Sequence, residues 1–445
     1  MISDPLLLSV ILIGIMFFFL LSSVWIGSAL MLTGVAGMFI YEHNLPAAIS
    51  LFDKTGDLLA GSIYSSLNSW SLAALPMFIL MGEILYHSSI STKLLNGLIP
   101  WLSNVPGRLL HVNVAACSLF AAVSGSSAAT TATVGKITLG ELKSRGYSKK
   151  LAIGSLAGSG TLGFLIPPSL IMIIYGVLSN VSIGKLFIAG IFPGLLLATS
   201  YSLYIMIAST IDKRAVPATY ETFSMRHKIA SLKDLAPIFL LITLVLGSIY
   251  GGYATPTEAA ALGVVGAIIL ALYFKSFSWI IFKDSLLNAV KTTVMISFII
   301  AGAGFLSQVV GFLGIARAIS EYIGGLGLSP YMLILVIGVM YIILGMILDG
   351  ISIVVMTLPI VLPIVTMAGF DPLWFGIFLV FMVELSQITP PVGFSLFVIQ
   401  SISGERIDYI LKATFPFFII MVLIVAVVTL FPEIVFYLPE KMTGK

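Results

Sequence analysis

Serine, threonine and glycine fill residues 123–135, which read V-S-G-S-S-A-A-T-T-A-T-V-G inside a strongly apolar region. The hydroxyl oxygens of Ser124, Ser126 and Ser127 suit a hard monovalent cation such as Na⁺, whereas a proton needs a titratable carrier. Non-helical backbone at membrane depth is tolerated only where it lines a cavity or is buried in protein. These residues therefore predict a polar binding site.

Two further stretches contain paired prolines: residues 160–169 read G-T-L-G-F-L-I-P-P-S, and residues 389–393 read T-P-P-V-G. Proline interrupts a helix because it lacks the backbone N–H and clashes with the preceding turn. A break would free carbonyl oxygens near Gly163, Ile166 and Thr389, and these could complete a cation site. The alternative is that each pair only kinks a continuous helix.

Two acidic residues lie in apolar segments, where ionisable side chains are rare and usually functional. Asp349 stands beside Gly350 in L-D-G-I-S and could neutralise a bound cation. Glu384 lies in E-L-S-Q-I-T-P-P, shortly before the second proline pair. For both residues a purely structural role is the alternative.

The elements that hold these residues must be membrane helices. Of the 445 residues, 59% are hydrophobic and only 9% are charged, with a mean hydropathy of +1.13. Soluble domains carry about 25% charged residues, and one spanning helix needs roughly 20 apolar residues. We predict an all-α polytopic membrane protein with about ten transmembrane helices and two re-entrant hairpins. The sequence contains no P-loop motif, so energy must come from an ion gradient or another subunit.

The same plan occurs twice along the chain. Gly125 precedes Pro167 by 42 residues, and Gly350 precedes Pro390 by 40. Paired interruptions in corresponding positions of two halves indicate a transporter site. We therefore divide the chain into a first repeat (1–211, with a hairpin at about 109–135 and a broken helix at 151–175), a connecting loop (212–234) and a second repeat (235–445, with a hairpin at about 331–366 and a broken helix at 373–402). For residues 109–135, the alternative is one ordinary span with a small-residue packing face.

An odd number of spans per half makes the two repeats inverted. The N-terminus then lies outside, and the connecting loop at 212–234 is cytoplasmic. This topology places 17 lysines and arginines inside and 5 outside. That distribution agrees with the positive-inside rule.

The motifs together resemble the large membrane subunit of TRAP (tripartite ATP-independent periplasmic) transporters. The matching segments spread over nearly the whole chain, and they include Y-A-T-P-T-E-A-A-A, L-D-G-I-S-I-V-V-M-T-L-P-I and I-T-P-P-V-G-F. The resemblance implies an elevator-type fold in two inverted repeats, with a scaffold and a mobile domain that holds both hairpins. It also implies Na⁺-driven import of an organic acid anion across the bacterial inner membrane, with a periplasmic N-terminus.

The resemblance implies two protein partners, a small four-helix membrane subunit and a periplasmic substrate-binding protein. Because the chain starts directly at the large subunit, we expect the small one to be a separate chain. Besides these and the lipid bilayer we expect no nucleic-acid partner and no enzymatic activity. Substrates in the family include C4-dicarboxylates, sialic acids and other carboxylates.

The site residues follow from the matching motifs, with two or more Na⁺ ions expected. The cation ligands carried over are Ser124, Ser126, Gly163, Ile166 and Pro168, with counterparts at Asp349, Gly350, Thr389 and Gly393. The positions that we assign to the substrate are Ser127, Thr130, Thr161, Pro167, Ser352, Glu384 and Pro390.

Two alternatives remain open at this point. A stand-alone carrier of the divalent-anion/Na⁺ symporter type has a similar hairpin architecture and would work without a binding protein. An intramembrane enzyme would need a nucleophile with a positioned partner. Ser124 and Ser126 have no histidine or lysine at a plausible depth in the sequence.

Overall fold

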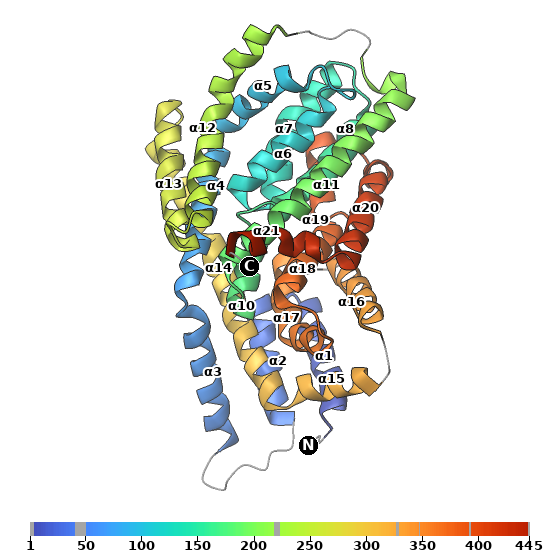
Figure 1. Ribbon diagram of the computed structural model, residues 1–445. Helices are drawn as coiled ribbons and strands as arrows, with labels where there is room; N and C mark the ends of the chain where they lie inside the picture. The colour runs from blue at the N-terminus through green and yellow to red at the C-terminus, as the bar shows by residue number, and fades with distance from the viewer. Residues whose placement is uncertain are drawn as a thin grey trace.

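The computed structural model is built from helices packed side by side, and it confirms the predicted all-α class (Figure 1). It describes residues 4–40, 50–217, 223–325, 329–346, 348–390 and 393–443. Within these ranges, eight helices are long and apolar enough to cross a membrane. Helices suit this environment because every backbone N–H and C=O must find its partner within the segment.

One group of helices forms an outer body around the long helix α14. Helices α2, α3 and α4 pack along α14, while α12 packs on α5 and α13 packs on α4. Small residues allow the close approach, since a Cβ on Gly302 would lie 2.5 Å from the carbonyl oxygen of Gly27. The outer body comprises α1 (Pro5–Leu21), α2 (Ile26–Ile40), α3 (Leu51–Leu67), the short helix η1 (Trp70–Ala73), α4 (Ala74–His87), α5 (Ile90–Leu102), α12 (Met225–Tyr250), α13 (Pro256–Tyr273), α14 (Trp279–Phe312) and α15 (Ile315–Gly325).

The remaining helices form a second group, which we call the hairpin body. Its members are α6 (Leu110–Ser124), α7 (Ser127–Ser144), α8 (Lys149–Gly160), α9 (Leu162–Leu165), α10 (Leu170–Ser179), α11 (Ile183–Ile211), α16 (Pro330–Gly345), α17 (Gly350–Met367), α18 (Pro372–Gln387), α19 (Phe394–Ser403), α20 (Ile407–Leu430) and α21 (Glu433–Thr443). Helices from the two halves of the chain interlock here: α7 packs on α19, α8 on α20 and α10 on α17.

The order of elements in the first half recurs in the second with opposite orientation. In each half a short helix (α5, α15) precedes a helical hairpin (α6–α7, α16–α17) and an interrupted helix. Figure 1 shows α5, α6 and α7 in the upper part of the molecule and α15, α16 and α17 in the lower part. The two hairpins therefore enter the molecule from opposite sides.

Several helices extend beyond their apolar segments, and the predicted boundaries were too short there. The second arm of the first hairpin, α7, continues to Ser144 rather than ending at 135. Helix α12 begins at Met225, inside the predicted connecting loop 212–234, and its first turns carry Arg226, Lys228 and Lys233. A helix can continue into water where charged side chains are solvated, but hydropathy marks only the part inside the lipid.

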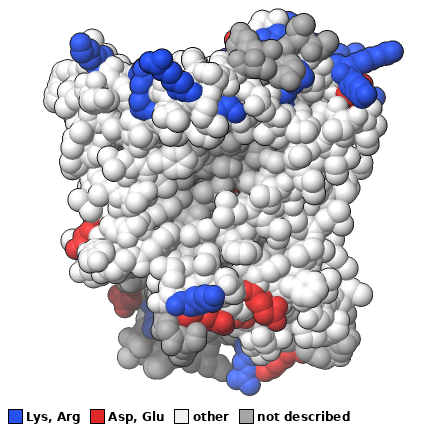
Figure 2. Space-filling view, turned by 45° about the horizontal axis from the view of Figure 1, so that its top comes forward, with Lys and Arg blue, Asp and Glu red and all other residues white. Residues whose placement is uncertain are grey.

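On the face that Figure 2 shows, the charged side chains are concentrated toward the two ends of the molecule. Figure 2 shows lysines and arginines along the upper rim, an almost uncharged band below them, and acidic and basic residues together near the lower end. In Figure 1 the N-terminal end lies at the bottom, opposite the start of α12. The uncharged band fits the hydrocarbon layer of a bilayer.

Candidate functional site

The tip of the first hairpin is a tight turn that lies directly against the first interrupted helix. Helix α6 ends at Ser124, Gly125 has a φ of +60°, and Ser126 caps the start of α7. The carbonyl oxygen of Gly125 accepts a hydrogen bond from the N–H of Leu170 over 3.2 Å. A Cβ on Gly125 would lie 2.8 Å from the carbonyl oxygen of Pro168, so only glycine fits here without strain.

The first interrupted helix loses its regular hydrogen bonding around the proline pair. Helix α8 ends at Gly160, the short α9 follows, and α10 begins only at Leu170. Ile166 is extended, with φ −84° and ψ 123°, and the Pro167–Pro168 peptide bond is cis. The break leaves helix-terminal carbonyl groups without the partners of a continuous helix.

Gly163 brings the backbone of this broken helix into contact with the first hairpin tip. A Cβ at this position would lie 2.5 Å from the backbone N and Cα of Ser127. Ser127 is 0% exposed, and Ser124 Oγ lies 2.9 Å from Oγ1 of the equally buried Thr130. The structure therefore gathers the serine-rich tip and the G-T-L-G segment at one point.

The tip of the second hairpin is capped by Asp349. Its Oδ2 accepts hydrogen bonds from the N–H groups of Ile351 and Ser352, at 3.1 and 3.3 Å, and its Oδ1 accepts one from the Ser352 hydroxyl. Asp349 is exposed, whereas Ser352 is fully buried. This geometry is typical of an N-cap, so the carboxylate stabilises α17 whether or not it binds a cation.

The second tip also meets both interrupted helices. A Cβ on Gly350 would lie 2.5 Å from Cγ1 of Val383 and 3.5 Å from Cε2 of Phe164. At the end of α16, a Cβ on Gly345 would overlap the side chain of Ser386. The second tip thus lies on α18 and touches the first broken helix through the ring of Phe164.

The second interrupted helix breaks after Gln387. Thr389 donates its hydroxyl hydrogen to the carbonyl oxygen of Leu385 over 2.6 Å, and Pro390 is exposed. Pro391, the second proline of this pair, lies outside the described residues. Gly393 has a φ of +40° and precedes α19.

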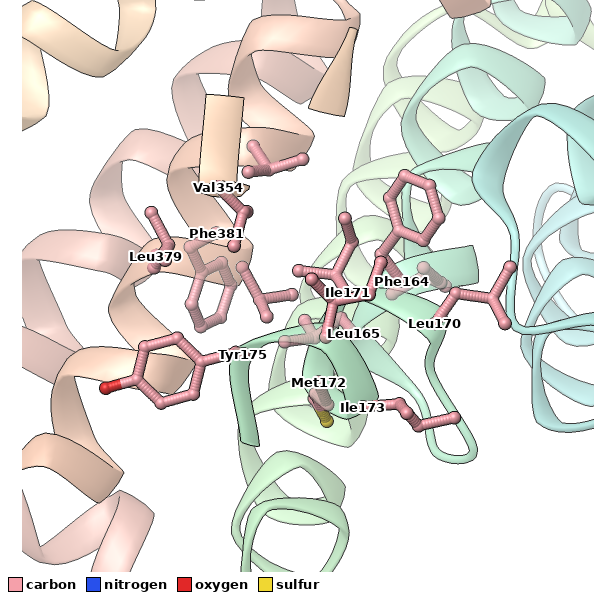
Figure 3. Close-up of a cluster of buried hydrophobic side chains, with 14 of the residues drawn as sticks. Phe164, Leu165, Leu170, Ile171, Met172, Ile173, Tyr175, Val354, Leu379 and Phe381 are labelled. Carbon is pink, nitrogen blue, oxygen red and sulfur yellow. The ribbon is translucent and has the colours of Figure 1, made fainter. Parts of the chain in front are cut away.

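Apolar packing fixes the relative position of the broken helices and the second hairpin. Figure 3 shows side chains of α9 and α10, among them Leu165, Ile171 and Tyr175, facing Val354 of α17 and Leu379 and Phe381 of α18. The Tyr175 hydroxyl donates a hydrogen bond to the carbonyl oxygen of Pro372 over 2.5 Å. Close-packed protein interiors resist displacement of a single helix. This packing therefore gives the site a rigid support.

Glu384 links the two halves at the centre of this arrangement. Its side chain is 0% exposed, and Oε1 accepts hydrogen bonds from Ser127 Oγ at 2.6 Å and from the N–H of Phe164 at 2.8 Å. Phe164 was not among the predicted site residues, although it lies within the G-T-L-G-F motif. Its role depends on its backbone N–H and on its contact with the second tip, which residue type does not reveal.

The family of this chain is shown by its similarity to known proteins. Residues 13–434 match the family described as "Tripartite ATP-independent periplasmic transporter, DctM component". The chain belongs to this family of TRAP transporters. The predicted resemblance to the large TRAP membrane subunit is therefore confirmed.

This TRAP subunit is similar in sequence to named permeases and in fold to a solved transporter structure. It is 35% identical over 383 residues to the C4-dicarboxylate TRAP transporter large permease protein DctM of Pseudomonas aeruginosa, covering 86% of this chain and 89% of the relative. It is 28% identical to the sialic acid TRAP transporter large permease protein SiaM of Vibrio cholerae, covering 94% and 98%. The YdaH transporter of Alcanivorax borkumensis has a similar fold, with a TM-score of 0.64, 11% identity, and coverage of 90% and 96%.

Proposed function

We propose that this TRAP subunit uses a Na⁺ gradient to import an organic acid anion. The observation that carries the proposal is the junction of two hairpin tips and two interrupted helices around Phe164 and Glu384. Discontinuous helices that meet near the bilayer midplane form the ion and substrate sites of many secondary transporters.

Neutral oxygen atoms favour Na⁺ as the coupled ion. Within the ranges that the structure describes, no group of three or more His, Cys, Asp or Glu residues could hold a metal. Hydroxyl and freed carbonyl oxygens at each junction suit a hard monovalent cation. We propose one cation site per half, and thus two or more ions. The proposed ligands are Ser124, Ser126, Gly163, Ile166 and Pro168 in the first half, and Asp349, Gly350, Thr389 and Gly393 in the second.

The substrate lies between these two junctions in our proposal. Helices α7 and α17 are 18 residues long, and both begin at a hairpin tip. Their positive N-terminal ends favour an anionic group. The names of the relatives support a C4-dicarboxylate or a sialic acid. The proposed substrate-contacting positions are Ser127, Thr130, Thr161, Pro167, Ser352 and Pro390.

An elevator movement is the transport mechanism that we propose. The hairpin body contains both tips and both broken helices, and its helices interlock across the two halves. The outer body around α14 would stay fixed in the membrane as the scaffold. A rigid hairpin body can carry the site from one side of the membrane to the other without rebuilding it.

We propose that the subunit lies in the bacterial inner membrane with a periplasmic N-terminus. Basic residues gather along one rim of the molecule (Figure 2), where the start of α12 lies, and the N-terminal end lies at the other. Cytoplasmic segments carry the excess of lysine and arginine. We further propose a separate small membrane subunit and a periplasmic substrate-binding protein as partners, as the tripartite family description suggests.

Uptake into proteoliposomes tests the proposed function. The full chain would be reconstituted with the small subunit and the candidate binding protein encoded beside it, and a panel of labelled organic acids offered with a Na⁺ or a K⁺ gradient. We expect uptake of one carboxylate class that needs both Na⁺ and the binding protein. Uptake that is indifferent to Na⁺ would overturn the coupling. Uptake without any binding protein would favour the stand-alone symporter type. The relatives are named as permeases, which supports transport rather than an intramembrane enzyme.

A further inference from the structure

The Glu384 side chain contacts hydrogen-bond donors that come only from the other half of the chain. Ser127, the first residue of α7, donates its hydroxyl hydrogen to Oε1, and Phe164 of the first broken helix donates its N–H to the same atom. Glu384 itself lies on α18, in the second half. One carboxyl group therefore connects the first tip and the first break to the second broken helix.

The second carboxyl oxygen of Glu384 has no role in structural hydrogen bonding. Oε2 is buried and has no hydrogen-bond partner, and no ion pair involves Glu384 among the described residues. A buried carboxyl group without a basic partner is costly to desolvate. The unpartnered Oε2 gives the fold no hydrogen bond that offsets this cost, so its presence points to a function.

The two donors are the residues on which the geometry of the site depends. Ser127 lies next to Ser126, and its backbone contacts Gly163. Ser126 and Gly163 are both proposed cation ligands. Phe164 follows Gly163 directly, and its ring touches the second tip at Gly350. Holding Ser127 and Phe164 on one acceptor atom therefore fixes the spacing between the ligands of the first cation site.

Among the residues that the structure describes, this connection exists in only one of the two junctions. Glu384 and Thr161 each stand six residues before the first proline of a pair, so Thr161 is the equivalent position in the first half. Ser352 is likewise equivalent to Ser127, since each stands two residues after the tip glycine. Ser352 donates its hydroxyl hydrogen to Asp349 within its own tip instead. The serine of the first tip therefore bonds to a residue of the other half, whereas the serine of the second tip bonds to a residue of its own hairpin.

We propose that Glu384 is a positioning residue for the first Na⁺ site, which makes cation binding in the first half depend on a side chain of the second. This role replaces the direct substrate contact expected from the sequence, because Oε1 already has two protein donors. The inference rests on the proposed Na⁺ coupling.

Na⁺-dependent thermal stability of the purified full-length chain tests this role without a substrate. Unfolding temperature would be followed while NaCl replaces KCl at constant ionic strength, since a ligand that binds only the folded state raises it with concentration. We expect Glu384→Leu, which removes both acceptor oxygens, to raise the half-saturating Na⁺ concentration by about tenfold or more, as for the loss of a buried hydrogen bond. A merely structural role would lower stability equally in Na⁺ and K⁺ and leave the half-saturating concentration unchanged.

Ser127→Ala provides a second, independent variant that removes the donor instead of the acceptor. We expect it to weaken Na⁺ binding in the same direction, and the double variant with Glu384→Leu to be no weaker than the more affected single one, because both remove the Ser127–Glu384 hydrogen bond. The matched control is Glu258→Leu, which changes an exposed glutamate at the start of α13 and should leave the half-saturating Na⁺ concentration unaltered.

Two results distinguish failure of this inference from failure of the proposed function. Na⁺ stabilisation of the wild type that neither Glu384→Leu nor Ser127→Ala weakens, or that the two weaken additively, would overturn the positioning role alone. A wild type that Na⁺ and K⁺ stabilise equally would overturn the proposed Na⁺ coupling, and the positioning role with it.

Discussion

Ser127 and Glu384 are 257 residues apart in sequence, yet the hydroxyl of one lies 2.6 Å from the carboxylate of the other. The first belongs to the tip of one hairpin and the second to the interrupted helix of the other half. This pair joins the two halves, because the first tip and the first break find their acceptor on a helix of the second half.

The close contact between Gly163 and Ser127 makes Gly163→Ala a destabilising change. The added methyl would lie 2.5 Å from backbone atoms, which cannot move aside as a flexible side chain can. We expect a loss of about 1–3 kcal/mol in the free energy of unfolding, together with a loss of Na⁺-dependent uptake. Thermal unfolding in detergent measures the first effect.

The matched control is Gly140→Ala in α7, where nothing lies within 4 Å of the new methyl. This control should be neutral or stabilising by about 0.5–1 kcal/mol. Equal behaviour of the two variants would contradict the packing seen here.

Asp349→Asn separates helix capping from charge. Asparagine caps a helix about as well as aspartate, so we expect the free energy of unfolding to change by less than about 1 kcal/mol. If Asp349 neutralises a cation, the half-saturating Na⁺ concentration for uptake should rise. Asp371→Asn is the control, since Asp371 caps α18 in the same way at an exposed position. Na⁺ dependence equal to that of the wild type would remove Asp349 from the proposed site.

Gly345→Ala tests the support of the second tip. A methyl there would overlap the side chain of Ser386, which is itself fully buried in α18. We expect a loss of about 1–3 kcal/mol from overpacking, measured as a lower unfolding temperature. Gly311→Ala in α14 has open space around the new methyl and should not lower it. Tolerance of Gly345→Ala would show that α16 and α18 are further apart than the structure indicates.

A cross-link between the two bodies tests the elevator movement. Lys136 of α7, in the hairpin body, donates a hydrogen bond to the Tyr86 hydroxyl of α4, in the outer body, over 3.1 Å. Joining cysteines at these two positions with a thiol-reactive cross-linker should stop uptake, because α7 could no longer move past α4. The native Cys117 is fully buried and should react little.

The control for that experiment is a cross-link within the hairpin body. Lys149 at the start of α8 forms an ion pair with Glu405, which lies between α19 and α20. Cysteines at these positions should cross-link without loss of uptake. Inhibition by this pair as well, or full activity with the Tyr86–Lys136 pair joined, would argue against relative movement of the two bodies.

Local sequence features predicted the positions of the unusual elements. The proline pair at Pro167 marks the first interruption, and Gly125 marks the first tip, where its φ of +60° is one that side chains disfavour. These predictions were possible because helix breaking depends on the residue itself. Helix ends beyond the lipid, as in α7 up to Ser144, could not be predicted because hydropathy gives no signal in water.

The sequence alone therefore determined the all-helical membrane class, the family and the places where the helices break. Only the tertiary structure decided which of the polar groups meet. It joined Glu384 to Ser127 and Phe164 of the other half. The physical reason is that hydropathy and backbone geometry act over a few neighbouring residues, whereas the partner of a buried carboxylate depends on how distant helices pack.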